Sequence, residues 1–374
     1  MSAAGLTLLA GLALHPVLLL QPQLELQDTE DAGENGYGLA RARLGARVEW
    51  SSRVTAVVTA ELAIERPGLL DGYLVLRPLP MLALAAGLAK SPLFVSGRDE
   101  TIESMPINER STLVRSFWPF REVGAEVHLL PIDQPIEAWA RASNGTSSVL
   151  GNDLRSGLAF DGRVDLVLGR ARRTTESFGL RLGGGLRFED AGEKAGIGGA
   201  NVTGFPFYRA PVISGRRLLA EGHLLVYYGP LRFLVEAALA HESRSVDDDG
   251  NPTTPRRDLD AISSRGASTE LAWMFTGQQR QPGTFVSTAT TGGIFDQVAG
   301  ELAVRAERLV LGRGAEDVLE GGATGLSAAV NAWAWGLLGV SLQLHWLAYD
   351  LPPLELPEAP SGWVALLRLT LALR

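Results

Sequence analysis

The stretch "LARARLGARVEW", residues 39–50, alternates between two kinds of side chain along its whole length. Arg41, Arg43, Arg47 and Glu49 share one parity, and the other parity holds only Ala, Leu, Val and Trp. A helix, at about 100° per residue, would spread these arginines around its axis, whereas a strand places every second side chain on one face. An ordinary strand has about 5–6 residues and a tilted membrane-crossing strand about 9–11. The stretch therefore predicts a long strand with one apolar and one charged face.

The same alternation recurs along the chain, strongly in residues 178–189, 298–307 and 340–349 and more weakly elsewhere. About sixteen strands are predicted in this way. The predicted strands are 17–27, 39–50, 54–65, 71–77, 82–90, 123–129, 136–143, 156–167, 178–189, 217–227, 231–242, 265–275, 298–307, 325–335, 340–349 and 366–374.

The segments between these strands alternate in length. Tight connectors are expected at 51–53, 78–80, 228–230 and 335–339, and long polar or glycine-rich ones at 28–37, 91–122, 144–155, 190–214, 243–263, 309–323 and 350–361. Short turns at one end and long loops at the other are typical of an outer-membrane barrel. Large aromatic residues such as Trp50, Trp273, Trp335 and Trp363 fall near strand ends, where a barrel meets the membrane interface.

We therefore expect an all-β fold, a transmembrane antiparallel up-and-down β-barrel in the bacterial outer membrane. A barrel of this size is too wide for side chains to fill, so the polar face should line water and the apolar face should contact lipid. The alternative is a soluble two-sheet protein with the same alternation inverted. Such a sandwich would hold its large aromatic residues in mid-strand, within the core.

Composition narrows the classes of function. The 374 residues carry a formal net charge of −8, which argues against a general nucleic-acid binder, and the chain has no cysteine for a disulfide or thiolate metal site. Only Lys90 and Lys194 are lysines, so nearly all the basic residues are arginines. Residues 1–13 resemble a short secretory signal with cleavage near Ala13, which leaves 14–374 as one barrel.

Several segments resemble the phosphate-selective porin family, porins O and P. In the C-terminal third these are "RGASTELAWMFTGQQRQPGTF", "GELAVRAERLVLG", "GLSAAVNAWAWGLLGVSLQLHWLAYD" and "ALLRLTLALR". In the N-terminal third the arginine strand, "DGYLVLRPLPMLALAAGLAKSPL" and "ERSTLVRSFWPFREVGAEVHL" are similar to the early strands of that family. The resemblance covers about two thirds of the chain, and the middle third matches only in the order of its elements.

The resemblance implies a sixteen-stranded passive diffusion channel for small hydrophilic solutes, usually a homotrimer, whose lumen cations attract small anions such as phosphate. It places the loop 91–122 inside the pore. The expected pore-lining residues are Arg41, Arg43 and Arg47 on the arginine strand, Lys90, Arg110 and Arg115 around the loop, and, by parity alone, Arg141, Arg181, Arg187 and Arg305. No cofactor or enzymatic activity is expected, and the other partners are outer-membrane lipid and lipopolysaccharide.

Three alternatives stay open. Glutamates such as Glu61, Glu189 and Glu301 share the lumen parity, so the arginines could be salt-bridge braces and not anion sites. The barrel could also be a scaffold or receptor subunit whose lumen is plugged by 91–122. Hydrolysis at the lipid boundary would need Ser beside His, and no histidine has an obvious serine partner at strand spacing. The glycines at 183–185 are one candidate for a trimer interface.

Overall fold

The computed structural model describes most of the chain. The described residues are 6–9, 11–28, 35–63, 67–130, 134–145, 157–169, 171, 176–246, 256–283, 286, 297–353, 356 and 358–373. No helix in these ranges is long and apolar enough to cross a membrane.

Sixteen antiparallel strands form a closed barrel, and each pairs with its sequence neighbour in the ring. The ring closes where the last strand pairs with the first, with Leu367 opposite Leu24. Closure satisfies every strand edge, which a sheet inside a bilayer requires. The strands are β2 (Leu12–Gln27), β3 (Gly36–Trp50), β4 (Val54–Glu61), β5 (Gly68–Leu79), β6 (Leu82–Lys90), β7 (Arg121–Leu129), β8 (Ile136–Ser143), β9 (Ala159–Gly169), β10 (Phe178–Ala195), β13 (Val212–Tyr228), β14 (Leu231–Val246), β15 (Arg257–Trp273), β16 (Val298–Arg313), β17 (Gly321–Ala334), β18 (Leu338–Tyr349) and β19 (Ser361–Leu373).

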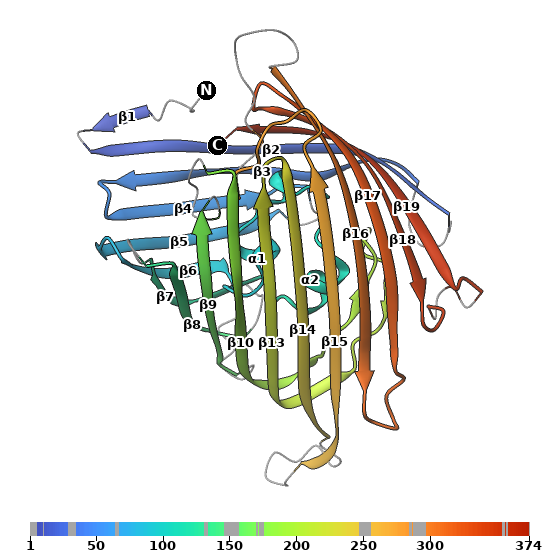
Figure 1. The fold of residues 1–374 in the computed structure, drawn as a ribbon. Coiled ribbons are helices and arrows are strands. Elements are labelled where there is room, and N and C mark those ends of the chain that lie inside the picture. Colours follow the sequence, from blue (N-terminus) through green and yellow to red (C-terminus); the bar gives the residue numbers. More distant parts are fainter. Residues whose placement is uncertain are drawn as a thin grey trace.

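Three short strands and three short helical segments are not among the sixteen strands of this ring. Strand β1 (Leu6–Leu9) pairs with the start of β2, so residues on both sides of position 13 are described as strand; cleavage there stays a prediction. Strands β11 (Gly199–Ala200) and β12 (Pro206–Tyr208) form a hairpin in a long loop. The segments α1 (Val95–Arg98), η2 (Ile102–Ser104) and α2 (Thr112–Phe117) belong to the loop between β6 and β7, and α1 and α2 lie inside the ring of strands (Figure 1).

The direction of the two faces is as predicted. Leu44 is 58% exposed and Leu182 50% exposed on the outer surface, while Arg187 and Glu189 on the opposite parity of β10 are buried inside. Trp50, Trp273 and Trp335 are exposed at the end of the barrel with the short turns. The wall is therefore apolar toward lipid and charged toward the lumen, and the soluble sandwich is excluded.

Strand height differs around the ring. Strands β4, β6, β7 and β8 have eight or nine residues, whereas β10 and β13–β16 have sixteen to eighteen. The tall strands were predicted too short, because residues 243–246, 257–263 and 309–313 were assigned to loops. Above the bilayer both faces meet water, so the apolar alternation ends while the backbone ladder continues.

Candidate functional site: a charged lumen crossed by a folded loop

Residues 91–120 form the main structure inside the lumen. The helix α1 seats Val95 against Leu225 and Leu234 of the wall, and η2 seats Ile102 and Met105 against the opposite wall at β2 and β19. Because the loop crosses from one wall to the other and returns, it narrows the barrel at mid-height. The position predicted for 91–122 inside the barrel agrees with the structure, but its short helical segments were not predicted.

Apolar patches on the inner wall receive this loop. Leu93, Phe94, Leu113 and Phe117 are buried in one cluster with wall residues of β13, β14, β16, β17 and β18. Glycine makes further room, because a Cβ on Gly185 would lie 2.5 Å from the Leu93 side chain. Gly183 likewise faces Asp165 in the lumen, so these two glycines serve the inner face. Gly184, between them, shares the outward parity of Leu182 and Leu186, so the candidate trimer interface at 183–185 is reduced to this glycine and stays a prediction.

Carboxylates on the wall hold the loop backbone. Glu236 accepts hydrogen bonds from the Ser96 backbone N–H at 3.0 Å and from the Ser96 hydroxyl at 2.6 Å. Glu307 accepts from the Thr112 hydroxyl at 2.8 Å and from the Leu113 N–H at 3.3 Å. Wall donors reach the loop carbonyls in return, as Arg305 does to the Glu109 carbonyl oxygen at 2.8 Å. These bonds satisfy loop polar groups that would otherwise be buried without partners.

Three connected chambers remain beside the loop. The outer chamber, about 560 Å³, lies at the end with the long loops, under the β11–β12 hairpin. The middle chamber, about 350 Å³, shares Arg115 and Phe120 with it. The inner chamber, about 550 Å³, reaches the short turns and shares Ile102 and Arg110 with the middle chamber. Ile102 and Arg110 therefore line the constriction between the two.

Basic side chains outnumber carboxylates in each chamber, although the whole chain is acidic at −8. Among the described residues, the inner chamber has seven basic side chains and three carboxylates, the middle chamber four and two, and the outer chamber two and none. The basic residues are Arg43, Arg47, Arg77, Lys90, Arg98, Arg110 and Arg121 in the inner chamber, Arg41, Arg110, Arg115 and Arg368 in the middle one, and Arg115 and Arg209 in the outer one.

Seven of the ten predicted pore-lining residues form ion pairs in the lumen. Arg41 is bidentate to Glu109 at 3.0 Å, and Arg43 lies 2.7 Å from Glu61. The others are Arg47 with Glu49, Arg141 with Glu126, Arg181 with Asp165 and Glu137, Arg187 with Glu122, Asp161 and Glu189, and Arg305 with Glu270. Arg141, Arg181, Arg187 and Arg305 are at most 9% exposed. Their contacts are those of braces, as the alternative interpretation expected.

Lys90, Arg110 and Arg115 differ, because no described carboxylate forms an ion pair with them. The ammonium group of Lys90 donates to the Glu100 carbonyl oxygen at 3.1 Å, and Arg110 donates to those of Ser96 and Gly97 at 3.2 and 3.3 Å. Burial, together with the charges of Arg121, Arg41 and Arg43, lowers the pKa of Arg110 to about 9, which leaves it charged at neutral pH. Carbonyl oxygens orient Lys90 and Arg110, and no described carboxylate pairs with them, so these side chains can interact with a passing anion.

Sequence reasoning missed several cations of the lumen. Arg77 and Arg368 lie on the inward parity of predicted strands, so a stricter use of the alternation would have found them. Arg121 shares the parity of the outward Val123 and Val127, so the alternation gives no signal for it. Arg98 is on the loop and has no such signal. Arg280, in the segment between β15 and β16, pairs with Glu301 and also donates to the Ser104 carbonyl oxygen of the loop. Residues 276–297 were predicted neither as a tight connector nor as a long one. In the described part of this segment, the Arg280 side chain points into the lumen.

Two histidines have serine partners that sequence spacing did not reveal. His345 Nδ1 lies 2.9 Å from Ser327 Oγ inside the lumen, and His241 Nδ1 lies 3.2 Å from Ser263 Oγ on the outer surface. Each pair joins neighbouring strands and is therefore invisible to spacing along one strand. Among the described residues, no third side chain forms a hydrogen bond with either ring. In the same ranges, no group of three His, Asp or Glu side chains is placed to hold a metal ion.

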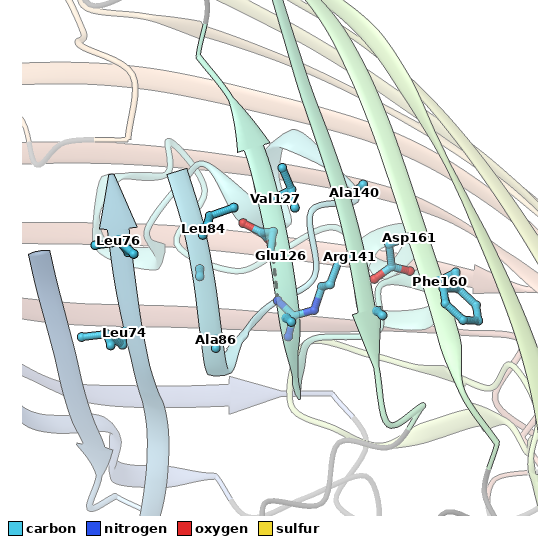
Figure 2. Close-up of a pocket in the computed structure, with 13 residues that line it drawn as sticks. Leu74, Leu76, Leu84, Ala86, Glu126, Val127, Ala140, Arg141, Phe160 and Asp161 are labelled. Atoms are coloured by element: carbon cyan, nitrogen blue, oxygen red, sulfur yellow. Dashed lines mark hydrogen bonds and ion pairs between the residues drawn. The ribbon is translucent and has the colours of Figure 1, made fainter. Parts of the chain in front are cut away.

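The part of the barrel built from the short strands β6, β7 and β8 is called the low wall below. Its outer face contains a hollow of about 660 Å³ (Figure 2). Its floor is a cross-strand row of small side chains, Ala86, Ala125 and Ala142, and the row ends in Leu74 on β5 and Phe160 on β9. Glu126 and Arg141 lie on the same strands and form an ion pair on the lumen side. Among the described residues, these three alanines form an outward patch of small side chains on the short strands of the barrel.

The paired arginines lead to a prediction about stability. We expect Arg187→Met to lower the free energy of unfolding by about 3–5 kcal/mol, because it leaves three buried carboxylates without their partner. Arg308→Met, which breaks the more exposed pair with Asp350, should cost at most about 1 kcal/mol. Urea titration of the barrel in detergent measures both. Equal losses would contradict the bracing role of Arg187.

Solved structures with the same architecture include proteins of three bacteria. OmpT of Vibrio cholerae in its trimer form has a TM-score of 0.59 at 10% identity, with 96% of this chain and 99% of that chain covered. An anion-selective porin from Comamonas acidovorans has a TM-score of 0.58 at 11% identity, covering 96% and 99%. The outer-membrane channel DcaP of Acinetobacter baumannii has a TM-score of 0.56 at 9% identity, covering 99% of each chain.

The chain has the fold of a bacterial outer-membrane porin. Near-complete coverage in both directions means that this likeness extends over the whole chain. No protein-family model matches the sequence. No curated protein matches it either. Identities near 10% show the fold alone, so the particular resemblance to phosphate-selective porins stays a prediction.

Proposed function

We propose that this barrel is a passive diffusion channel with a preference for small anions, phosphate among them. The observation that carries the proposal is the positive charge of all three chambers within an acidic chain. A ring of cations raises the local anion concentration and lowers the barrier to permeation. Arg110 at the constriction and Lys90 in the inner chamber contribute most, because neither is paired with a described carboxylate.

The anion preference should be moderate. Three carboxylates line the inner chamber, and Arg121 there is held by Asp71 at 2.8 Å. A site that binds an anion too tightly does not conduct. Single cations spaced along the route, and not one cluster that encloses a phosphate, are consistent with passage of small anions as a class.

Planar-bilayer recording tests the proposal directly. The purified protein should give stepwise current. In a potassium chloride gradient, its reversal potential should shift from zero toward the Nernst potential of chloride. Increasing salt should weaken the preference, because the field of exposed charges is screened within about 10 Å at 0.1 M. A reversal potential on the potassium side would contradict anion preference while leaving a channel.

A plugged scaffold is the second candidate, favoured by how firmly the loop is seated. Phe94, Leu113 and Val114 are fully buried, and the loop contacts both walls. A plugged barrel gives no stepwise current under the same conditions. The recording therefore separates the two functions.

We also propose that the protein is a homotrimer whose copies meet along the low wall. Small side chains permit close approach, and the short strands β6–β8 are the part of the wall least able to span a bilayer alone. One of the similar structures, OmpT of Vibrio cholerae, is described as a trimer form. We place the interface at the hollow because its floor consists of the small side chains of Ala86, Ala125 and Ala142.

Filling the hollow tests this interface. We expect Ala125→Trp to release monomers, because an indole at its centre would block close contact between barrels. Ala306→Trp, on an exposed outward position of the tall strand β16, should keep the native oligomer. Sedimentation in detergent measures the mass of each. A trimer that tolerates Ala125→Trp would place the interface elsewhere.

A further inference from the structure

A cluster of polar side chains lies on the outer surface of the tall wall, at the end of its apolar stripe. Ser263 is central: His241 on β14 lies 3.2 Å away, and Arg313 on β16 is its cross-strand partner on the other side. Arg265 lies two residues from Ser263 on the same face, opposite Leu239 and Val310. We call His241, Ser263, Arg265 and Arg313 the outer basic cluster.

These four side chains point away from the lumen. All are exposed, while Glu242 and Ser264, their neighbours on the opposite parity, are buried inside. Arg313 reaches the outer face through a bulge, because two residues of β16 lie between Val310 and Arg313 where one residue of β15 lies between Ser263 and Arg265. Gly312 supplies the positive φ, +72°, that this bulge requires.

The height of the cluster can be estimated along β15. Trp273 marks the membrane interface at the short-turn end, and Leu271 is exposed on the same face. A strand rising about 3.4 Å per residue at a tilt of about 40° climbs about 2.6 Å per residue along the membrane normal. Arg265 then lies about 21 Å above Trp273 and Ser263 about 26 Å, against an apolar band of about 25 Å. The cluster is at the border with the lipid headgroups.

Arg265 lacks a described partner at this border. Arg308, on the same outer face and closer to the turns, is bidentate to Asp350 at 2.5 and 2.8 Å. Arg313 has only a weak, exposed pairing with Glu320 at 3.9 Å. No described carboxylate pairs with Arg265, whose register partners are Leu239 and Val310. A guanidinium facing lipid is unfavourable unless it reaches the interface and finds an anion there.

We propose that the outer basic cluster binds the phosphate group of a phosphorylated lipid in the membrane leaflet at the long-loop end. Arg265 and Arg313 donate charge-assisted hydrogen bonds to the phosphate oxygens, a geometry that suits planar guanidinium groups. His241 and Ser263 add hydrogen-bond donors between them. The acyl chains of the same lipid lie along the apolar stripe of Leu239 and Leu271 below. The proposal requires the barrel in a membrane and does not require the channel to be open.

The test uses the full-length barrel, stripped of lipid in a zwitterionic detergent, and phosphatidic acid as the probe. Native mass spectrometry should show one tightly held phosphatidic acid, with occupancy at least about tenfold lower in Arg265→Gln, the factor expected for a charge-assisted hydrogen bond. Arg265→Lys should restore part of it. Arg308→Gln is the matched control on the same face and should bind as the native protein does.

Two further measurements distinguish a lipid phosphate from free inorganic phosphate. Diacylglycerol with the same chains should show no difference between native protein and Arg265→Gln, and inorganic phosphate at the lipid's concentration should not displace the lipid. Equal phosphatidic acid occupancy in native and Arg265→Gln barrels would overturn the proposal, and so would full displacement by inorganic phosphate. Single-channel current from Arg265→Gln, recorded in parallel, should equal that of the native protein, so failure of this site and failure of the channel are distinguishable.

Discussion

Replacing Lys90 and Arg110 together by Gln should lower the ratio of anion to cation permeability more than any other neutralising pair in the lumen. Each side chain acts on a permeating ion within a few ångströms, where one unit charge contributes about 1 kcal/mol at 4 Å in water. That energy corresponds to about fivefold in permeability for each charge. Both side chains are oriented by carbonyl oxygens, and neither is paired with a described carboxylate.

The matched control removes a cation without changing net charge. Arg43→Gln combined with Glu61→Gln deletes an ion pair of 2.7 Å from the same lumen. We expect this pair of substitutions to leave the reversal potential unchanged, although it removes the same type of side chain. If it shifted the reversal potential as far as Lys90→Gln with Arg110→Gln, selectivity would depend on pore shape and not on uncompensated charge.

A charge introduced at Leu113, where the loop contacts the wall, should have the largest effect on single-channel conductance. Leu113 is fully buried in the apolar cluster that seats α2 on the wall. Leu113→Asp places an unpaired carboxylate there at a cost of several kcal/mol, which the ionised form can avoid if the loop leaves its seat. The barrel keeps its ring of backbone hydrogen bonds, so we expect a folded protein with larger and noisier single-channel current.

Leu113→Met conserves volume and polarity and should reproduce native conductance. The decisive comparison is current amplitude at matched folding, with folded barrel judged by its slower migration in unheated gel samples. Native current from a folded Leu113→Asp protein would mean that the loop is not the constriction. The middle and inner chambers would then have to narrow elsewhere than at Ile102 and Arg110.

The periodicity of the sequence determined the barrel. Residues 39–50 identify a strand with a charged and an apolar face, and the aromatic residues at strand ends separate a membrane barrel from a sandwich. A side-chain period of two is a local property, readable without knowing which strands pair. The same parity placed all the predicted wall arginines on the lumen side. It failed mainly above the bilayer, where water on both faces removes the apolar signal from a continuing strand, and it also missed the start of β2 at Leu12.

What each arginine does was decided by tertiary structure alone. Arg41 and Arg110 are the same residue type in the same lumen, yet one is bidentate to Glu109 and the other is oriented by carbonyl oxygens. That difference depends on the course of residues 91–120 between two walls, far from Arg41 in the sequence. Likewise His241 and Ser263 meet only because β14 pairs with β15 in one register. Alternation fixes the side a residue faces, but the charge it meets there depends on which distant segment folds against it.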